Sequence, residues 1–364
     1  MLKNNTHDEY VRSDMPGVRV YLKNEGLCDP FGKHASFRGE EAFDGLLKGW
    51  QRWQKPSPES QADQELNRLI IESMRRNTAQ ICGLHDRLIE KMMVKVPRGK
   101  KILLVAILRA GLFISLGLAK RMAYLSGEDV PVVALGLFHE AGIDRQAFAQ
   151  ICADYPEYYP VFVDGWTGRG VVAAELREDC SRLNDAPDLQ GFPLLATLVD
   201  PGHYGDLWGT DQDVLLECAH FSAPEVLGFS RAFIKDPGQM WHAYTYPDEY
   251  CNHALIEAWL NIFSSENSNL PEDRPCKVQN LDALLNEITL ITGTQAGQWK
   301  VNINEVARTF VNRKPKQLIL GITSAEAECS IPSIVYLAEK YSVPVEFIPQ
   351  LGEKYNFLAA VRVK

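Results

Sequence analysis

The stretch that decides the fold is VFVDGWTGRGV, residues 161–171. Its apolar start is typical of a buried strand, the carboxylate of Asp164 ends that strand, and a glycine-rich turn leads into a helix. In open α/β sheets, ligands gather outside the carboxyl ends of strands, where backbone N–H groups at helix N-termini attract anions. We therefore predict a strand at 160–164, a helix at 169–182 and an anion site at the turn between them.

A second stretch, ILRAGL at residues 107–112, has the same character. It follows a predicted strand at 101–108 and opens a predicted helix at 112–125. Gly111 lets the backbone approach a ligand closely, and Arg109 supplies a forked cation. A phosphate or diphosphate would suit this loop.

The surrounding pattern indicates a doubly wound α/β fold with a parallel sheet. Further strands are predicted at 131–137 and 193–199. Before the sheet, apolar residues recur with helical spacing, which predicts a helix pair or one long helix, interrupted near Gly83 and ended by residues 97–99. Residues 200–265, rich in Gly, Pro and aromatic residues up to Tyr250, are expected to form an irregular hood over the carboxyl edge of the sheet.

Composition limits the classes of protein. The 364 residues are 46% hydrophobic and 23% charged, as in globular chains, and no apolar run reaches the roughly 18–20 residues of a membrane span. We expect a soluble cytoplasmic protein with no membrane partner; a homodimer stays open. Eight cysteines are scattered without a C-x-x-C pair, which favours reduced thiols; they are Cys28, Cys82, Cys152, Cys180, Cys218, Cys251, Cys276 and Cys329.

A polar stretch divides the chain. We predict a first domain at 1–265, made of an arm and helices at 1–97, a core at 98–200 and the hood, then a linker at 266–274 and a second domain at 275–364. From Asp273 onward 11 Lys and Arg stand against 9 Asp and Glu, so the net charge of −9 is −11 before that point and +2 after it. The acidity therefore does not argue against nucleic acid at the second domain.

The two glycine loops together resemble the diphosphate loop and the phosphoribosyl-pyrophosphate (PRPP) motif of type I phosphoribosyltransferases. ILRAGL is close to the uracil phosphoribosyltransferase version, and VFVDGWTGRG resembles the phosphoribosyltransferase-like proteins of bacterial tellurite-resistance and stress gene clusters. The resemblance implies that fold, with its hood, and a pentosyltransferase that exchanges a nitrogenous base and diphosphate at ribose C1′ in nucleotide metabolism.

The resemblance also implies roles for single residues. Arg109 and Asp164 would be catalytic, with Mg²⁺ held through PRPP and in part by Asp164, and with no direct metal ligand set otherwise. PRPP would be bound by Ala110, Gly111, Gly165, Thr167, Gly168, Arg169, Gly170 and Val171. The loop at 138–159 occupies the position of a mobile flap, with His139, Asp144 and Arg145 as candidates.

The motif departs from the family pattern at two positions. Val163 stands where a first acid is usual, and Gly170 replaces the usual hydroxyl residue. These departures favour an alternative in which the domain is catalytically inactive and senses PRPP or a nucleotide.

The last ninety residues predict a small α/β/α sandwich, with helices at 281–288, 302–312 and 331–341 and strands at 317–322, 344–348 and 357–363. The helix start NEVAR, residues 304–308, resembles the Asn-Glu-x-x-Lys start of Pelota and kink-turn-binding ribosomal proteins. That resemblance implies binding of structured RNA. Its residues would be Lys300, Asn304, Glu305 and Arg308.

A cysteine protease is the third alternative, because relatives of this protein group have been described in that way. Cys329 and the triplet Cys251-Asn252-His253 are its candidate nucleophiles. We rank it last on the sequence, since residues adjacent in sequence rarely meet as base and nucleophile and no third group is identifiable.

Overall fold

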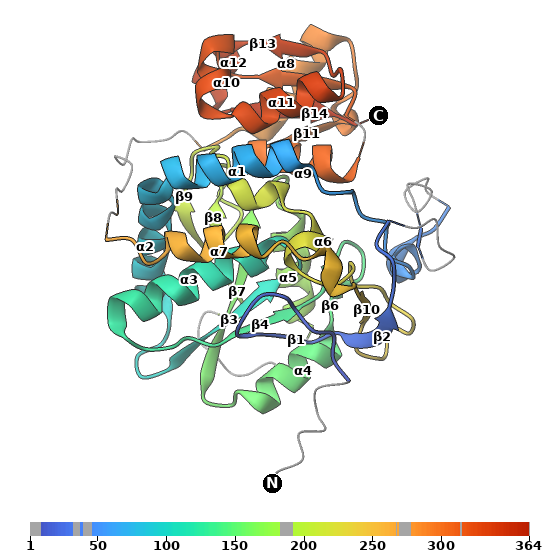
Figure 1. Ribbon diagram of the computed structural model, residues 1–364, viewed down its shortest axis with the longest axis vertical. Helices are drawn as coiled ribbons and strands as arrows, with labels where there is room; N and C mark the ends of the chain where they lie inside the picture. The colour runs from blue at the N-terminus through green and yellow to red at the C-terminus, as the bar shows by residue number, and fades with distance from the viewer. Residues whose placement is uncertain are drawn as a thin grey trace.

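The computed structural model describes residues 9–31, 37–38, 46–182, 192–266, 268, 278–313 and 315–363, and Figure 1 shows their arrangement. The predicted linker at 266–274 lies outside the described residues except for positions 266 and 268, and Cys276 lies outside them too. We refer to the residues up to 266 as the N-terminal part and to 278–363 as the C-terminal part. No helix among the described residues is long and apolar enough to cross a membrane.

A six-stranded sheet forms the centre of the N-terminal part, and every pair of neighbouring strands in it is parallel. This confirms the predicted α/β class with a parallel sheet. In spatial order its strands are β1 (Val18–Val20), β4 (Val132–Leu135), β3 (Lys101–Ile107), β7 (Tyr158–Trp166), β8 (Leu194–Val199) and β9 (Leu207–Thr210). The sequence pattern did not indicate β1 and β9, because three or four residues at a sheet edge are too short to show a period.

Helices cover both faces of this sheet. Successive residues of β3 alternate between the faces: Leu104 and Ala106 join the large core cluster, whereas Val105 belongs to a second one. The larger cluster includes residues of α1 (Gln64–Arg76), α2 (Thr78–Lys95), α3 (Ala110–Ser126) and α7 (His253–Ile262). The second includes residues of α4 (Arg145–Asp154) and α5 (Val171–Cys180).

The break between the first two helices lies at Asn77 rather than at Gly83. The Asn77 side chain donates to the buried carboxylate of Glu217, at 3.0 Å, and to Ser73, which anchors the bend between α1 and α2. Gly83 is buried within α2. The break between α1 and α2 is therefore fixed by the contact of Asn77 with Glu217, which lies 140 residues later in the sequence, and not by the position of Gly83.

The segment at 138–159, predicted as a long loop, contains regular structure. It holds β6 (Gly142–Ile143), which pairs with β5 (Leu137–Phe138), and then α4. Asp144 is fully buried and caps α4 by accepting the N–H of Ala147 at 3.0 Å. The prediction of a long loop here is wrong, because this cap starts a helix that packs on the sheet, whereas the role of the segment as a mobile flap stays a prediction.

The hood combines short elements with a parallel pair of strands, β10 (His242–Thr245) and β2 (Lys23–Leu27). Its remaining regular elements are η3 (Glu217–His220), α6 (Ala223–Val226) and η4 (Asp248–Tyr250); η2 (Gly49–Trp53) lies before α1 in the chain. A strand of the N-terminal arm, β2, thus pairs with a strand of the hood, β10, in one two-stranded sheet.

The C-terminal part has a four-stranded mixed sheet in the order β11-β14-β12-β13. These strands are β11 (Trp299–Val301), β14 (Ala359–Arg362), β12 (Gln317–Leu320) and β13 (Val345–Phe347). Its helices are α8 (Leu281–Thr292), η5 (Ala296–Gln298), α9 (Ile303–Asn312), α10 (Ser324–Ser330), α11 (Pro332–Lys340) and α12 (Pro349–Tyr355). Every predicted helix and strand is found, and β11, α10 and α12 are additional.

The two parts are joined by a shared core and by buried hydrogen bonds. Val306 and Phe310 of α9 belong to the same core cluster as α1 and α3. Figure 1 shows α1 and α9 at this junction, beneath the C-terminal sheet. Asp213 accepts the N–H groups of Ile303 at 3.0 Å and Leu358 at 2.9 Å. The C-terminal part is therefore packed on the N-terminal part.

Candidate functional site

The two predicted loops meet at the carboxyl ends of adjacent strands. β3 leads into the first loop and β7 into the second, and these strands pair directly. The approach is close at Gly111, where an added Cβ would lie 1.9 Å from the carbonyl oxygen of Val163. Ala110 likewise lies against Gly165. The sequence correctly placed both loops at one sheet edge.

Arg109 is buried beside this edge with 8% of its surface exposed. Its guanidinium forms a two-pronged ion pair with Glu59, with Nη2 and Oε2 3.2 Å apart. Glu59 lies in the segment between η2 and α1, and sequence reasoning missed it because nothing local marks a glutamate there. The cation that we assigned to diphosphate is thus matched by a carboxylate of the chain itself.

Asp164 and Thr167 are also buried. Asp164 accepts the N–H of Gly165 at 2.8 Å, and burial raises the pKa of its carboxyl group to about 7. The Thr167 hydroxyl donates to the carboxylate of Asp200. Among the described residues, neither side chain hydrogen-bonds to a lysine or arginine.

The loop after β7 is covered by the C-terminal part. Trp166 Nε1 donates to Glu305 at 2.9 Å, and Arg169 donates to the carbonyl oxygens of Ala296 and Trp299 at 2.8 and 2.9 Å. Gly170 precedes α5 with a φ of +72°, which explains glycine there. Val171 begins α5 and is 40% exposed. This loop therefore serves the contact between the two parts.

The three flap candidates are held by the N-terminal part. His139 Nδ1 lies 2.7 Å from Glu175, and Arg145 forms an ion pair with Asp179. Asp144, besides capping α4, accepts the N–H of Trp241 at 2.6 Å. These interactions stabilise the hairpin and helix described above.

The four RNA candidates lie at or near the junction of the two parts. Asn304 is fully buried, accepts the N–H of Leu216 at 2.7 Å and donates to the carbonyl of Val214 at 2.8 Å. Arg308 donates to the carbonyl of Phe221 at 3.0 Å, and Lys300 pairs with Glu305 at 2.8 Å. RNA binding stays a prediction. An RNA that used these side chains would have to replace the intramolecular hydrogen bonds and the ion pair that they now form.

A different cluster lies where the hood leads into α7. Cys251 Sγ is 3.7 Å from His253 Nδ1, and the Cys251 side chain is partly buried. The two residues meet because Cys251 is extended and His253 is the first residue of α7, capped by Asn252. Our reason for ranking Cys251 and His253 low, that near neighbours in sequence rarely meet, is wrong at this position.

Asp14, from the N-terminal arm, is the third group of this cluster. Asp14 acts electrostatically on the Cys251 thiol, and the charges of His253 and Asp248 also act on the Asp14 carboxyl group. Burial, together with Asp14, raises the pKa of the Cys251 thiol to about 12. Sequence reasoning could not find Asp14, which lies 237 positions before Cys251 and has no motif around it.

Of the cysteines that the structure describes, only Cys251 lies within hydrogen-bonding distance of a histidine. Cys82 donates to the carbonyl of Ile262 at 3.2 Å, and burial raises the pKa of Cys152 to about 11. Cys329 is exposed on α10. The described residues include no group of three or more His, Cys, Asp or Glu that could hold a metal ion. The Mg²⁺ prediction, which depends on bound PRPP, stays a prediction.

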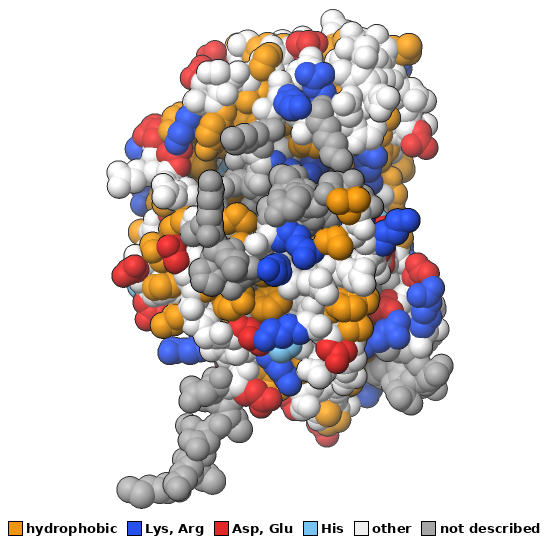
Figure 2. Space-filling model, turned by 90° about the vertical axis from the view of Figure 1, so that its right-hand side faces the viewer, with side chains coloured by type: hydrophobic (Ala, Val, Ile, Leu, Met, Phe, Trp, Pro, Cys, Tyr) orange, Lys and Arg blue, Asp and Glu red, His pale blue; other side chains and the backbone are white. Residues whose placement is uncertain are grey.

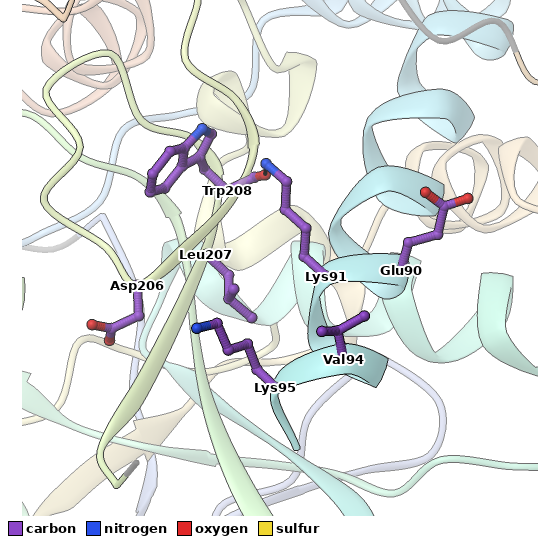
Figure 3. Close-up of a pocket in the computed structure, with 7 residues that line it drawn as sticks. All are labelled: Glu90, Lys91, Val94, Lys95, Asp206, Leu207 and Trp208. Carbon is purple, nitrogen blue, oxygen red and sulfur yellow. Dashed lines mark hydrogen bonds between the residues drawn. The ribbon is translucent and has the colours of Figure 1, made fainter. Parts of the chain in front are cut away.

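A pocket of about 390 Å³ lies between α2 and β9 (Figure 3). Lys91 crosses it and donates to the carbonyl of Trp208 at 2.8 Å. Its lining residues are Glu90, Lys91, Val94, Lys95, Asp206, Leu207 and Trp208. The lining contains no cysteine, histidine or hydroxyl side chain, so it offers no thiol or hydroxyl nucleophile.

Comparison with known proteins gives one family. The family model described as "Tellurite-like stress resistance cysteine protease StiP" matches residues 53–263. A search of curated proteins found no match. The match agrees with the predicted tellurite-resistance and stress group. It overturns the prediction of a phosphoribosyltransferase, and with it the transferase and nucleotide-metabolism activity, because the family is one of cysteine proteases.

Proposed function

Because the chain belongs to the StiP family of tellurite-like stress resistance cysteine proteases, we propose that it cleaves peptide bonds with Cys251 as nucleophile and His253 as general base. The observation that carries this proposal is the 3.7 Å contact between Cys251 Sγ and His253 Nδ1. Cys251 also lies within the residues that the family model matches, whereas the exposed Cys329 does not.

The chemistry requires a thiolate and a proton acceptor. In the first step the thiol proton passes to His253 Nδ1, and Sγ attacks the scissile carbonyl carbon. The tetrahedral intermediate collapses as the peptide C–N bond breaks, and His253 returns the proton to the leaving amine nitrogen. Water then hydrolyses the thioester, which restores the thiol and releases the acid.

The start of α7 supports this role. Cys251 lies two residues before a ten-residue helix, and the first N–H groups of a helix have no intrahelical acceptor. The N–H groups of His253 and Ala254 are therefore available to stabilise an oxyanion near Sγ. The same positive helix end favours a thiolate.

Asp14 opposes the thiolate. A carboxylate beside the sulfur stabilises the protonated thiol, which agrees with the direction of the Cys251 pKa shift. We infer that the contact with Asp14 holds Cys251 in a resting state and that its loss activates the thiol. Asp14→Asn should therefore raise the rate of iodoacetamide labelling of Cys251 at pH 8, read by peptide mass spectrometry.

Cleavage of a casein substrate and of unstructured peptide libraries tests the proposal. Cys251→Ser should abolish cleavage, since a serine hydroxyl is a far weaker nucleophile beside this base, and His253→Gln should reduce it by about 10² or more. The matched control is Cys329→Ser, which removes an exposed thiol outside the cluster. Full cleavage by Cys251→Ser would refute Cys251 as the nucleophile.

We further propose that the sheet and hood are type I phosphoribosyltransferase-like in topology, with an activity of a different class, and that 275–364 is Pelota-like. The parallel sheet with two glycine loops at adjacent strand ends supports the first part. The mixed four-stranded sheet between helices supports the second. Superposition of an experimental structure on members of both fold groups would test these assignments.

A further inference from the structure

The segment at 54–63, here called the strap, runs along the junction of the two parts. Glu59 donates its N–H to Pro30, Ser60 donates to the carbonyl of Val311 of α9, and Asp63 caps α1. The strap thus contacts the N-terminal arm, the C-terminal part and a core helix. Its Glu59 side chain is only 2% exposed and points at Arg109.

Three arginines act on this one carboxylate. Arg109 follows β3, Arg231 comes from the hood and Arg308 from α9, and the charge of each lowers the pKa of Glu59. We call Arg109, Arg231 and Arg308 the arginine cluster. Figure 2 shows basic side chains gathered along the middle of one face, at the level where the two parts meet.

Within the part of the chain that the structure describes, the arginine cluster carries more positive charge than the carboxylates facing it balance. Arg231 and Arg308 repel Arg109 and each other, and burial together with this repulsion lowers their pKa values to about 10 and about 9. Glu305 also acts on Arg308, but its carboxylate already pairs with Lys300 at 2.8 Å. Among the described residues, Glu59 is the carboxylate that acts on Arg231 and Arg308 as well as on Arg109, so the positive charges of the cluster outnumber the negative charge of that carboxylate.

Such an excess is unfavourable beside the buried pair of Arg109 and Glu59 unless an anion balances it. A single carboxylate can match one guanidinium with two hydrogen bonds, as Glu59 does with Arg109. A small oxyanion with two or more negative charges would balance more of the positive charge of the cluster and could accept hydrogen bonds from more than one guanidinium group. Glu59 therefore occupies the place that such an anion would take.

We propose that the arginine cluster is a binding site for a small oxyanion carrying two or more negative charges, and that Glu59 of the strap is its displaceable internal ligand. The ligand joins the β3 loop, the hood and α9, so its binding couples the two parts of the chain. This proposal goes beyond the proposed protease activity and uses none of its residues.

Isothermal titration calorimetry on the full chain tests this site, with inorganic phosphate in one arm and succinate in the other, at constant ionic strength maintained with chloride. Glu59→Gln removes the competing carboxylate but keeps its shape. We expect its Kd for one of the two anions to be at least about tenfold tighter than that of the unaltered chain, or about 1.4 kcal/mol. Adding Arg231→Gln should reverse this gain.

The matched control is Glu65→Gln, which removes an exposed carboxylate of α1 that forms an ion pair with Arg68. Tighter phosphate binding identifies a phosphate-type ligand, and tighter succinate binding a dicarboxylate. The proposal would be overturned if Glu59→Gln bound both phosphate and succinate no more tightly than Glu65→Gln does. If Glu59→Gln does not fold, titration of the unaltered chain against Arg231→Gln decides, since equal heats would refute the site.

Discussion

Replacing Asn304 by alanine tests how firmly the two parts are joined. Asn304 is fully buried, and its amide makes two hydrogen bonds to the hood, one with the N–H of Leu216 and one with the carbonyl of Val214. Truncation leaves both backbone groups without a partner in a dry interface. At about 2 kcal/mol for each buried unsatisfied group, we expect a loss of about 4 kcal/mol of unfolding free energy.

That loss can be converted into a melting temperature. With an unfolding entropy of about 2.1 cal/mol/K per residue, the whole chain has an entropy on the order of 0.8 kcal/mol/K, so Tm should fall by about 5 °C. The shared core predicts that both parts unfold in one transition. Urea unfolding followed by tryptophan fluorescence and by circular dichroism gives the free energy, and agreement of the two probes checks the single transition.

The control for this prediction is Asn286→Ala. Asn286 is exposed on α8 in the same part of the chain, and its replacement should change stability by no more than about 0.5 kcal/mol. A loss below about 1 kcal/mol for Asn304→Ala, or two separate transitions in the unaltered chain, would show that the junction is weak and wet and would refute the reasoning from buried hydrogen bonds.

Two further predictions concern packing and pH. Gly111→Ala should lower the free energy of unfolding by at least about 3 kcal/mol in urea, because the added Cβ would lie 1.9 Å from the Val163 carbonyl oxygen, although alanine favours helices. Gly297→Ala is the control, since a Cβ at Gly297 has no heavy atom within 4 Å. Equal stability of the two variants would contradict the close approach at Gly111. Burial lowers the pKa of His220 to about 3 in the folded chain. As the pH falls below about 6.5, His220 is therefore protonated in the unfolded chain but stays neutral in the folded chain. The free energy of unfolding decreases as the pH falls from about 6.5 toward about 3. Between pH 6.5 and 5 the unaltered chain should therefore lose about 2 kcal/mol more than His220→Gln does, and identical losses would speak against a neutral His220.

The strands and helices at the centre of both parts could be predicted because their patterns are local. β3, β7 and β8 are mostly apolar, as a strand buried on both faces requires, and they lie close to where the sequence places them. The helix in the segment at 138–159 was missed because its start depends on Asp144, whose buried carboxylate also accepts an N–H from Trp241. A cap of that kind is visible only once distant chain is in place.

The candidate sites divide in the same way. The two glycine loops were recognised from their residues, and their proximity follows from strand pairing. Their resemblance to a phosphoribosyltransferase led to the wrong activity, because loop shape reports fold, whereas activity depends on which side chains meet. Cys251 and His253 were visible as neighbours in sequence, but their contact and the role of Asp14 required the turn into α7 and the packing of the arm.

The sequence by itself determined the α/β class, the parallel sheet, the positions of its central strands and the two loops at one sheet edge, because periodicity and glycine turns act over a few residues. Only the tertiary structure decided what those loops contact. Glu59 pairs with Arg109 across 50 residues, and Glu305 reaches Trp166 across 139. The physical reason is that charges and hydrogen-bonding groups must find partners when they are buried, and the packed chain, rather than the local pattern, decides which partners are within reach.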